Sequence, residues 1–194
     1  MKTLALLAAL ISAPALAGQW EIDASHSSIG FSVRHLMVST VRGHFQKATG
    51  TVSIDDDDLT RSIIDVTIDA ASIDTREPKR DAHLRSADFF DVAKHPTITF
   101  KSKRIEKAGG GKLRAVGDLT LHGVTRQATL LVSTPSPAIK SPWGQMVRGV
   151  SATGRINRSD FGLTYNKALE AGGVLIGDEV ELQIDAELVS KPQS

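Results

Sequence analysis

Apolar and polar residues alternate along most of this chain with the period of two that is typical of β-strands. In the clearest stretch, residues 179–189, every even-numbered residue is apolar, and polar side chains occupy the odd positions from Glu181 to Glu187. This pattern predicts an antiparallel strand with one buried face and one hydrated face. The same alternation predicts strands at residues 28–35, 41–54, 64–70, 97–105, 112–121, 124–133 and 147–157.

The segments between these predicted strands are short and rich in turn-forming residues, as in Asp55–Asp58, Gly109–Gly111 and His122–Gly123. No internal repeat and no linker divides the chain, so we expect one domain over residues 18–194. About eight strands, each with one apolar face, bury those faces together in a two-sheet sandwich or in a closed antiparallel barrel. An eight-stranded barrel is either filled by side chains or holds one ligand, and the alternation alone leaves both open.

One segment, Asp74–Phe100, interrupts the alternation and predicts a short helix. Asp74 and Thr75 are good helix caps, and Pro78 follows in the first turn, where its missing N–H costs nothing. We interpret the segment as a lid, whose Arg and Asp side chains stay hydrated. Its narrow apolar edge is formed by Leu84, Phe89 and Phe90. A second short helix is expected at residues 166–171.

Residues 1–17 have the charged, apolar and A-x-A order of a secretory signal peptide, with cleavage expected after Ala17. The apolar run is much shorter than the roughly 20 residues that span a bilayer, and Pro14 interrupts it, which argues against a membrane anchor. The chain contains no cysteine, so an exported protein of this sequence folds without disulfide bonds. That combination favours a bacterial periplasm.

Charge narrows the classes of partner. Removing residues 1–17, which include one basic residue, leaves 177 residues with 22 Lys and Arg against 22 Asp and Glu. Proteins whose principal partner is nucleic acid or an anionic membrane usually carry a basic excess. The sequence therefore predicts neither as the principal partner, and it leaves open a transient membrane contact and a homodimer formed through an edge strand.

Two alternatives involve reactive side chains. Three histidines recur at regular spacing, but they do not share one strand face, and without cysteine or a tight His-x-His pair they form a poor metal-binding pattern. They are His26, His35 and His44. A hydrolase would need Ser28, His83 and Asp81 together, yet no Gly-x-Ser-x-Gly elbow surrounds a nucleophile. The sequence therefore predicts no metal ion, no cofactor and no catalytic residue.

A series of short motifs runs through nearly the whole of residues 18–194. In order they are His26–Phe31 with Val33 and His35, Val41–Phe45, Ser72–Thr75, Arg80–Leu84, Asp88–Asp91, His95–Pro96 with Phe100, Gly117–Thr125, Asn157–Gly162 and Gly177–Val180. This ordered set resembles the YceI family of periplasmic polyisoprenoid-binding proteins. The resemblance implies an eight-stranded, lipocalin-like antiparallel barrel, closed at one end, whose elongated cavity holds a long isoprenoid or a similar amphiphile. It implies no catalysis.

Inward-facing apolar residues are then expected to form the cavity wall, with ordinary core packing as the alternative for each. They are Phe31, Val33, Phe45, Val66, Ile68, Phe100, Leu119 and Leu121, with Phe90 reaching in from the lid. Polar side chains near a mouth are expected to bind the head group of the lipid through charge-assisted hydrogen bonds. These are His35, His83, Arg85 and Arg158. For Arg158 the alternative is a structural ion pair with Asp160.

The sequence thus favours a periplasmic protein that carries or stores an isoprenoid lipid of the polyprenyl phosphate or quinone type. Moving such a chain out of water gains about 0.8 kcal/mol per methylene. A lipid that leaves a bilayer is already dry, so its transfer into a barrel is nearly neutral, which suits a carrier. Two other functions stay open: an enzyme that acts on isoprenoids, and a stress-response interaction module with an empty barrel.

Overall fold

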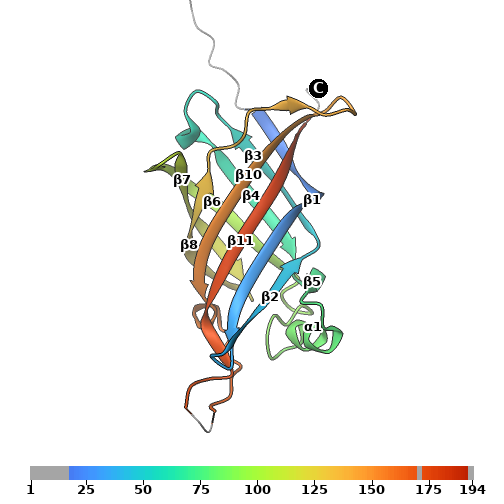
Figure 1. Ribbon diagram of the computed structural model, residues 1–194, viewed down its shortest axis with the longest axis vertical. Helices are drawn as coiled ribbons and strands as arrows, with labels where there is room; N and C mark the ends of the chain where they lie inside the picture. Colours follow the sequence, from blue (N-terminus) through green and yellow to red (C-terminus); the bar gives the residue numbers. More distant parts are fainter. Residues whose placement is uncertain (1–17, 170–171, 192–194) are drawn as a thin grey trace, which may run out of the picture.

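The alternating segments form one antiparallel sheet that closes on itself as a barrel (Figure 1). The structure is a computed structural model that describes residues 18–169 and 172–191, so the predicted signal peptide lies outside the described residues. The strands are β1 (Gly18–His35), β2 (Ser39–Phe45), β3 (Ala48–Ile54), β4 (Ile63–Asp69), β5 (Ile73–Asp74), β6 (Thr97–Gly109), β7 (Lys112–Leu121), β8 (Val124–Ser133), β9 (Ile139–Lys140), β10 (Met146–Asn157) and β11 (Ile176–Ser190). The helices are α1 (Pro78–Arg85) and the 3-10 helices η1 (Leu59–Arg61), η2 (Ala70–Ser72) and η3 (Arg158–Phe161).

Pairing between the first and last strands closes the barrel. The sheet runs β11-β10-β8-β7-β6-β4-β3-β1, and β1 pairs again with β11 from Trp20 opposite Ser190 to His35 opposite Ile176. The predicted fold class, a closed antiparallel barrel of eight strands with one short α-helix, is confirmed. None of the described helices is long and apolar enough to cross a membrane.

The stretch predicted as a single strand over residues 41–54 is two strands that lie end to end along β1. β3 pairs with the beginning of β1 and with β4, whereas β2 pairs with the end of β1. On its other side β2 pairs only with the short β5, through His44 and Phe45. The barrel wall is therefore incomplete beside β2, and the segment that contains α1 lies against this side in Figure 1.

The predicted helix begins later than expected. Asp74 and Thr75 precede α1 rather than cap it, because α1 begins at Pro78 and its N-cap is Glu77. The Glu77 carboxylate accepts a hydrogen bond from the backbone N–H of Lys79 at 3.1 Å. The first-turn position of Pro78 is as predicted.

Asp81 contradicts the expectation that the acidic side chains of this segment stay hydrated. It is buried, and its carboxylate accepts hydrogen bonds from the N–H and the Oγ1 of Thr75, at 2.9 and 2.5 Å. The carboxylate therefore fixes the chain that leads into α1. The second predicted helix is also wrong for its described part: residues 166–169 are not helical, and Ala168 forms an isolated bridge with Val174. Residues 170–171 lie outside the described residues.

The two ends of the barrel differ. At the upper end in Figure 1, the buried side chains of Trp20, Ile54 and Leu188 pack together, and Leu59 and Met146 lie against them. The β1–β2 turn, residues 162–169 and 172–176, and α1 lie at the lower part of the barrel. The apolar plug therefore closes one end, and the lower end is built from loops and the helix.

The β1–β2 turn has a backbone conformation that its residues rarely adopt. Leu36 and Met37 have φ values of +52° and +62°, and the N–H of Val38 donates to the carbonyl of His35 at 3.1 Å. Positive φ at both central positions is the signature of a type I′ turn, which strongly favours Asn-Gly. Each non-glycine residue in this region costs on the order of 1–2 kcal/mol.

Candidate ligand-binding cavity

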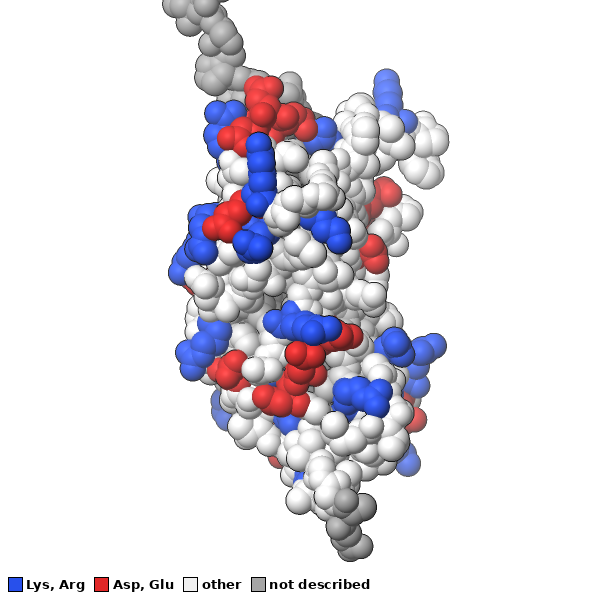
Figure 2. Space-filling model, turned by 60° about the vertical axis from the view of Figure 1, so that its left-hand side comes forward, with Lys and Arg blue, Asp and Glu red and all other residues white. Residues whose placement is uncertain are grey.

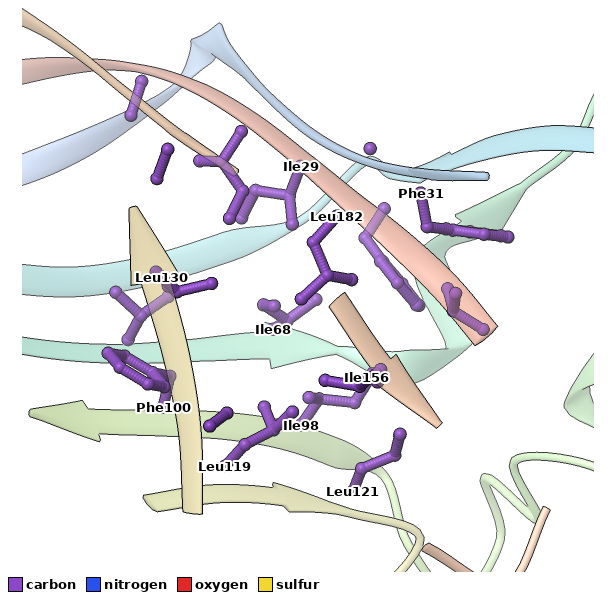
Figure 3. A pocket seen from close by; sticks show the side chains of 18 of the residues that line it. Ile29, Phe31, Ile68, Ile98, Phe100, Leu119, Leu121, Leu130, Ile156 and Leu182 are labelled. Atoms are coloured by element: carbon purple, nitrogen blue, oxygen red, sulfur yellow. The ribbon is translucent and has the colours of Figure 1, made fainter. Parts of the chain in front are cut away.

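An apolar cavity of about 440 Å³ lies inside the barrel, within the usual range for small-molecule sites. Figure 3 shows its apolar side chains converging from strands on different sides of the barrel. The labelled residues are Ile29, Phe31, Ile68, Ile98, Phe100, Leu119, Leu121, Leu130, Ile156 and Leu182. The alternation of apolar and polar residues was compatible with either a filled or a hollow interior. The structure shows a hollow interior.

The residues that line the cavity differ in how deeply they are buried. On β6 and β7 the lining residues Ile98, Phe100 and Leu119 are buried by one another and by their neighbours. On β1 and β11 the lining residues Val33 and Val180 are only half-buried, although they face the interior. Lining residues on β4 and β10, such as Ile68 and Ile156, are half-buried as well, so the accessible space extends along several strands of the wall.

All nine residues predicted for the cavity wall belong to the lining. They share inward positions on five strands and on the segment after α1, and they are Phe31, Val33, Phe45, Val66, Ile68, Phe90, Phe100, Leu119 and Leu121. Their contact with a ligand stays a prediction.

Aromatic contacts attach the lid segment to the wall. The ring centroids of Phe31 and Phe45 lie 5.8 Å apart, and the ring of Phe90 meets Phe45 edge-on, also at 5.8 Å. Leu84 and Phe89 of the same segment also line the cavity. The apolar edge predicted for this segment thus completes the wall where β2 lacks a long partner strand.

The Arg and His side chains of the lining are not balanced by acidic ones. Among the described residues that line the cavity there are three arginines and two histidines, and none is Asp or Glu. They are Arg34, His35, Arg80, His83 and Arg158. His35 pairs with Ile176 across strands, and Arg158 donates to the carbonyl of Ile176, so these two lie together at the lower end. An anionic group would meet only cations and neutral groups on this lining.

Arg158 is buried, and backbone carbonyls hold its guanidinium. It donates to the carbonyls of Gly177 at 2.9 Å, Tyr165 at 3.0 Å and Ile176 at 3.4 Å, and to that of Leu163. Burial lowers the pKa of Arg158, and the nearby charge of Asp178 opposes that shift. The ion pair with Asp160, considered from the sequence, is wrong, because these carbonyls are the partners that the described residues supply. The buried cation thus lacks a hydrogen-bonded carboxylate.

His83 and Arg80 connect α1 to the mouth of the cavity. The ring of His83 packs edge-on against Phe89 and Tyr165, each at a centroid distance of 5.0 Å, and its Nε2 lies 2.8 Å from a carboxylate oxygen of Asp88. The guanidinium of Arg80 donates to the Oγ1 and the carbonyl of Thr75, at 2.7 and 2.8 Å. Both side chains are held in place by contacts within the protein.

Arg85 is the one predicted head-group residue that the structure does not bring to the cavity. Its guanidinium donates to the carbonyls of Ala71 and Ile73, both at 2.7 Å, and it does not belong to the lining. His35, His83 and Arg158 do belong to it, and their contact with a head group stays a prediction. Arg34, Arg80 and Tyr165 are among the polar lining residues that the sequence did not predict. Arg80 lies in the Arg80–Leu84 motif, whereas the alternation on β1 predicts an outward position for Arg34.

The side chains of the hydrolase alternative have separate partners. Ser28 is exposed on β1, Asp81 is buried against Thr75, and His83 contacts Asp88. Neither Ser28 nor Asp81 lines the cavity. The arrangement therefore does not form a nucleophile, base and orienting acid.

Among the described residues, two groups of His, Asp and Glu side chains have possible metal-ligand atoms within 4.8 Å of one another, and neither brings the three regularly spaced histidines together. They are Asp91, His95 and His122, and Asp23, His26 and Glu187. Asp91 is already paired with Lys94 at 2.9 Å, and His26 is paired with Asp23 at 2.8 Å. Neither group lines the cavity.

Comparison with known proteins gives a consistent result. The family model of the YceI-like domain matches residues 20–188. A UPF0312 protein of Staphylococcus aureus strain MSSA476 is 38% identical over 165 residues, which cover 85% of this chain and 94% of the relative.

Solved structures share the barrel. The YceI protein of Campylobacter jejuni is 32% identical, with a TM-score of 0.69 and coverage of 88% of this chain and 96% of that one. BcnA of Burkholderia cenocepacia, at 23% identity, has a TM-score of 0.74 and coverage of 86% and 98%. A polyisoprenoid binding domain of Saccharophagus degradans implicated in plant cell wall breakdown has 18% identity, a TM-score of 0.62 and coverage of 91% and 100%. The last two show similarity of fold alone.

Proposed function

The chain belongs to the YceI-like family, and from this membership we propose that it carries or stores an isoprenoid lipid inside its barrel. The observation that carries the proposal is the cavity, which is apolar along its length and basic in its charged lining. The description of the Saccharophagus degradans domain as polyisoprenoid binding adds support. The proposal assigns no chemical step to the cavity.

The lining also favours one kind of head group. Arg158 is buried, carbonyls rather than a carboxylate accept its hydrogen bonds, and the charge of Asp178 offsets only part of the effect of burial, so an opposite charge in the cavity would be favourable. A phosphate supplies that charge and accepts hydrogen bonds from arginine in a favourable geometry. We therefore propose a polyprenyl phosphate rather than a quinone as the ligand.

The proposed place of action is the periplasm. Residues 1–17 read as an export signal, and the chain lacks cysteine. Binding from a bilayer brings little net gain for the tail, so head-group contacts decide the affinity and the lipid can be returned to a membrane. A reversible carrier in an aqueous compartment between membranes matches these properties.

The first experiment identifies the ligand. The mature protein, purified from its native compartment, is extracted with organic solvent, and the extract is measured by mass spectrometry and ultraviolet absorption. We expect about one polyprenyl phosphate per barrel with space for a single ligand. A quinone spectrum would contradict the head-group proposal. An extract without lipid would favour the empty module, and turnover of added isoprenoid that is lost in His83→Ala would favour the enzyme.

A second experiment isolates the head group. Affinities for a polyprenyl phosphate and for the matching polyprenol are measured for the wild type, for Arg80→Gln, and for Arg104→Gln as a control whose side chain pairs with Glu106 outside the cavity. Charged hydrogen bonds contribute about 1.5–3 kcal/mol, so the preference for phosphate should fall about tenfold or more in Arg80→Gln only. A general loosening of the lid should weaken the binding of both lipids equally, so it does not change the ratio of the affinity for the phosphate to that for the polyprenol. An unchanged ratio would remove Arg80 from the head-group site.

A further inference from the structure

A cluster of exposed apolar side chains lies at the lower end of the barrel. We name it the docking tip and define it as Leu36, Met37 and Val38 of the β1–β2 turn with Val174 of the neighbouring loop. Their exposed fractions are 38%, 51%, 78% and 38%. Clusters of exposed large apolar residues mark surfaces that meet a partner or a membrane.

The two loops of the docking tip are joined to each other. The N–H of Leu36 donates to the carbonyl of Leu175 at 2.8 Å, and Cγ of Met37 lies 3.4 Å from the position that a Cβ on Gly173 would take. The four apolar side chains are therefore presented as one unit rather than as separate mobile residues.

The conformation of the turn indicates that the side chains of Leu36 and Met37 do not stabilise the fold. Leu36 and Met37 occupy the two central positions of a type I′ turn, with φ values of +52° and +62°. Asn and Gly adopt this conformation with little strain, whereas leucine and methionine do not. Two large side chains that strain the backbone and remain exposed do not stabilise the free protein, so we look for their role in a bound state.

The docking tip adjoins the cavity. Arg34 and His35 on one loop and Leu175 and Ile176 on the other line the cavity directly behind the exposed residues. The opposite end of the barrel is filled by Trp20, Ile54 and Leu188. A lipid that leaves through the lower end would therefore emerge beside the docking tip.

Charge favours an anionic surface as the partner. Figure 2 shows mixed charges over the body of the barrel and a mainly uncharged surface where the described residues taper toward the lower end. In the described parts of residues 34–40 and 163–176, the side chains of fixed charge are Arg34 and Lys167, both exposed and both positive. Glu170 lies outside the described residues. Farther from the two loops the exposed charges are mixed, with Arg76, Glu77 and Lys79 before and at the start of α1 and Asp178 near the start of β11. Apolar side chains surrounded by basic ones are typical of segments that lie in the interface of anionic bilayers.

We propose that the docking tip inserts into an anionic phospholipid bilayer and thereby places the mouth of the cavity at the membrane surface. The proposal rests on the carrier function, because it names the surface through which cargo enters and leaves. It names a lipid bilayer, rather than a protein or a second copy of this chain, as the partner.

Flotation with vesicles tests the proposal directly. Mature wild-type protein is mixed with vesicles of phosphatidylethanolamine and phosphatidylglycerol, or of phosphatidylcholine alone, and the floating fraction is measured without added isoprenoid. The test variant is Leu36→Asn with Met37→Gly, which gives the turn its preferred residues. The control variant is Ile139→Ser with Trp143→Ser, which removes exposed apolar side chains, 63% and 81% accessible, from the hairpin at the other end.

We expect the wild type and the control to float with the anionic vesicles and to bind phosphatidylcholine less well. The test variant should partition about tenfold or more weakly, since each buried aliphatic side chain accounts for about a tenfold effect. Its thermal midpoint should be equal or higher, because the turn is relieved of strain, which excludes misfolding as the cause. Equal flotation of the test variant would overturn the proposal, as would loss of flotation in the control or a wild type that does not float.

Lipid extraction from the same samples separates this inference from the carrier function. A test variant that keeps its isoprenoid but does not float supports the docking tip, because binding in the cavity and binding to the membrane are then separate. If no sample contains isoprenoid but flotation still depends on the tip, docking stands and the carrier function fails. Concentration-dependent self-association in place of flotation would assign the tip to a second copy of the chain and overturn the membrane proposal.

Discussion

Truncation of Phe90 to alanine tests the lid. Phe90 is half-buried, lines the cavity and meets the ring of Phe45 edge-on at 5.8 Å. Truncation of a fully buried phenylalanine costs about 3–5 kcal/mol, and an aromatic pair contributes about 0.5–1.5 kcal/mol beyond area, so a half-buried ring should account for about 1–2 kcal/mol of lid closure. Bound lipid should then leave roughly 5–30 times faster.

The assay follows transfer of a bound polyprenyl phosphate from Phe90→Ala to excess acceptor vesicles. Val92→Ala is the matched control, because Val92 lies in the same segment and packs against the core without lining the cavity. The thermal midpoints of both variants, compared with that of the wild type, measure how much each substitution lowers the overall stability of the protein. A release rate for Phe90→Ala equal to that of the wild type or of the control would refute the lid interpretation.

Three further predictions concern the wall, the base of the lid and the surface. Phe100→Asp should abolish lipid retention, because it places a carboxylate in the apolar lining; lipid content is measured after circular dichroism confirms folding, and a folded variant with normal retention would remove Phe100 from the wall. Asp81→Ala leaves two donors of the buried Thr75 unpaired and should destabilise the lid segment by about 2–4 kcal/mol, read as faster amide exchange there, whereas Asp88→Ala, on the exposed side, should not. The carboxylate of Asp23 raises the pKa of His26 above its usual 6.5, and hydrogen bonds from Ser25 and then His26 lower the pKa of Asp23 to about 2. Stability from this pair should be present between these limits and fade as pH rises through the raised histidine pKa or falls toward 2; an NMR titration in which Asp23→Asn left the His26 pKa unchanged would contradict the pairing.

The strands and the wall could be read from the sequence because both follow from the alternation. An inward residue such as Val66 or Leu119 is two positions from the next inward residue, and antiparallel pairing preserves that order over many residues. The break between β2 and β3 could not be predicted, because neither Gln46 nor Lys47 is a typical turn-forming residue, and only the pairing of β2 with β5 and of β3 with β4 shows that one strand ends there.

The mouth was harder to predict because its residues depend on contacts between segments far apart in the chain. Tyr165 reaches the lining by packing against His83 and Phe89, and no local pattern announces this. Arg85 carries the same charge as Arg80, five positions earlier, yet carbonyls of the preceding segment hold Arg85 away from the cavity. Charge and sequence position identified candidates, but the fold decided which of them line the cavity.

Pairing of β1 with β11 also has a consequence for biogenesis. The strand that begins at Gly18 has as its partner a strand that ends at Ser190, so the ring is not sealed until almost the whole polypeptide has been delivered. Contacts of such long sequence separation form slowly. The interior of the barrel is thus complete only after the last strand has been made, so a ligand can be fully enclosed only once nearly the whole chain is present.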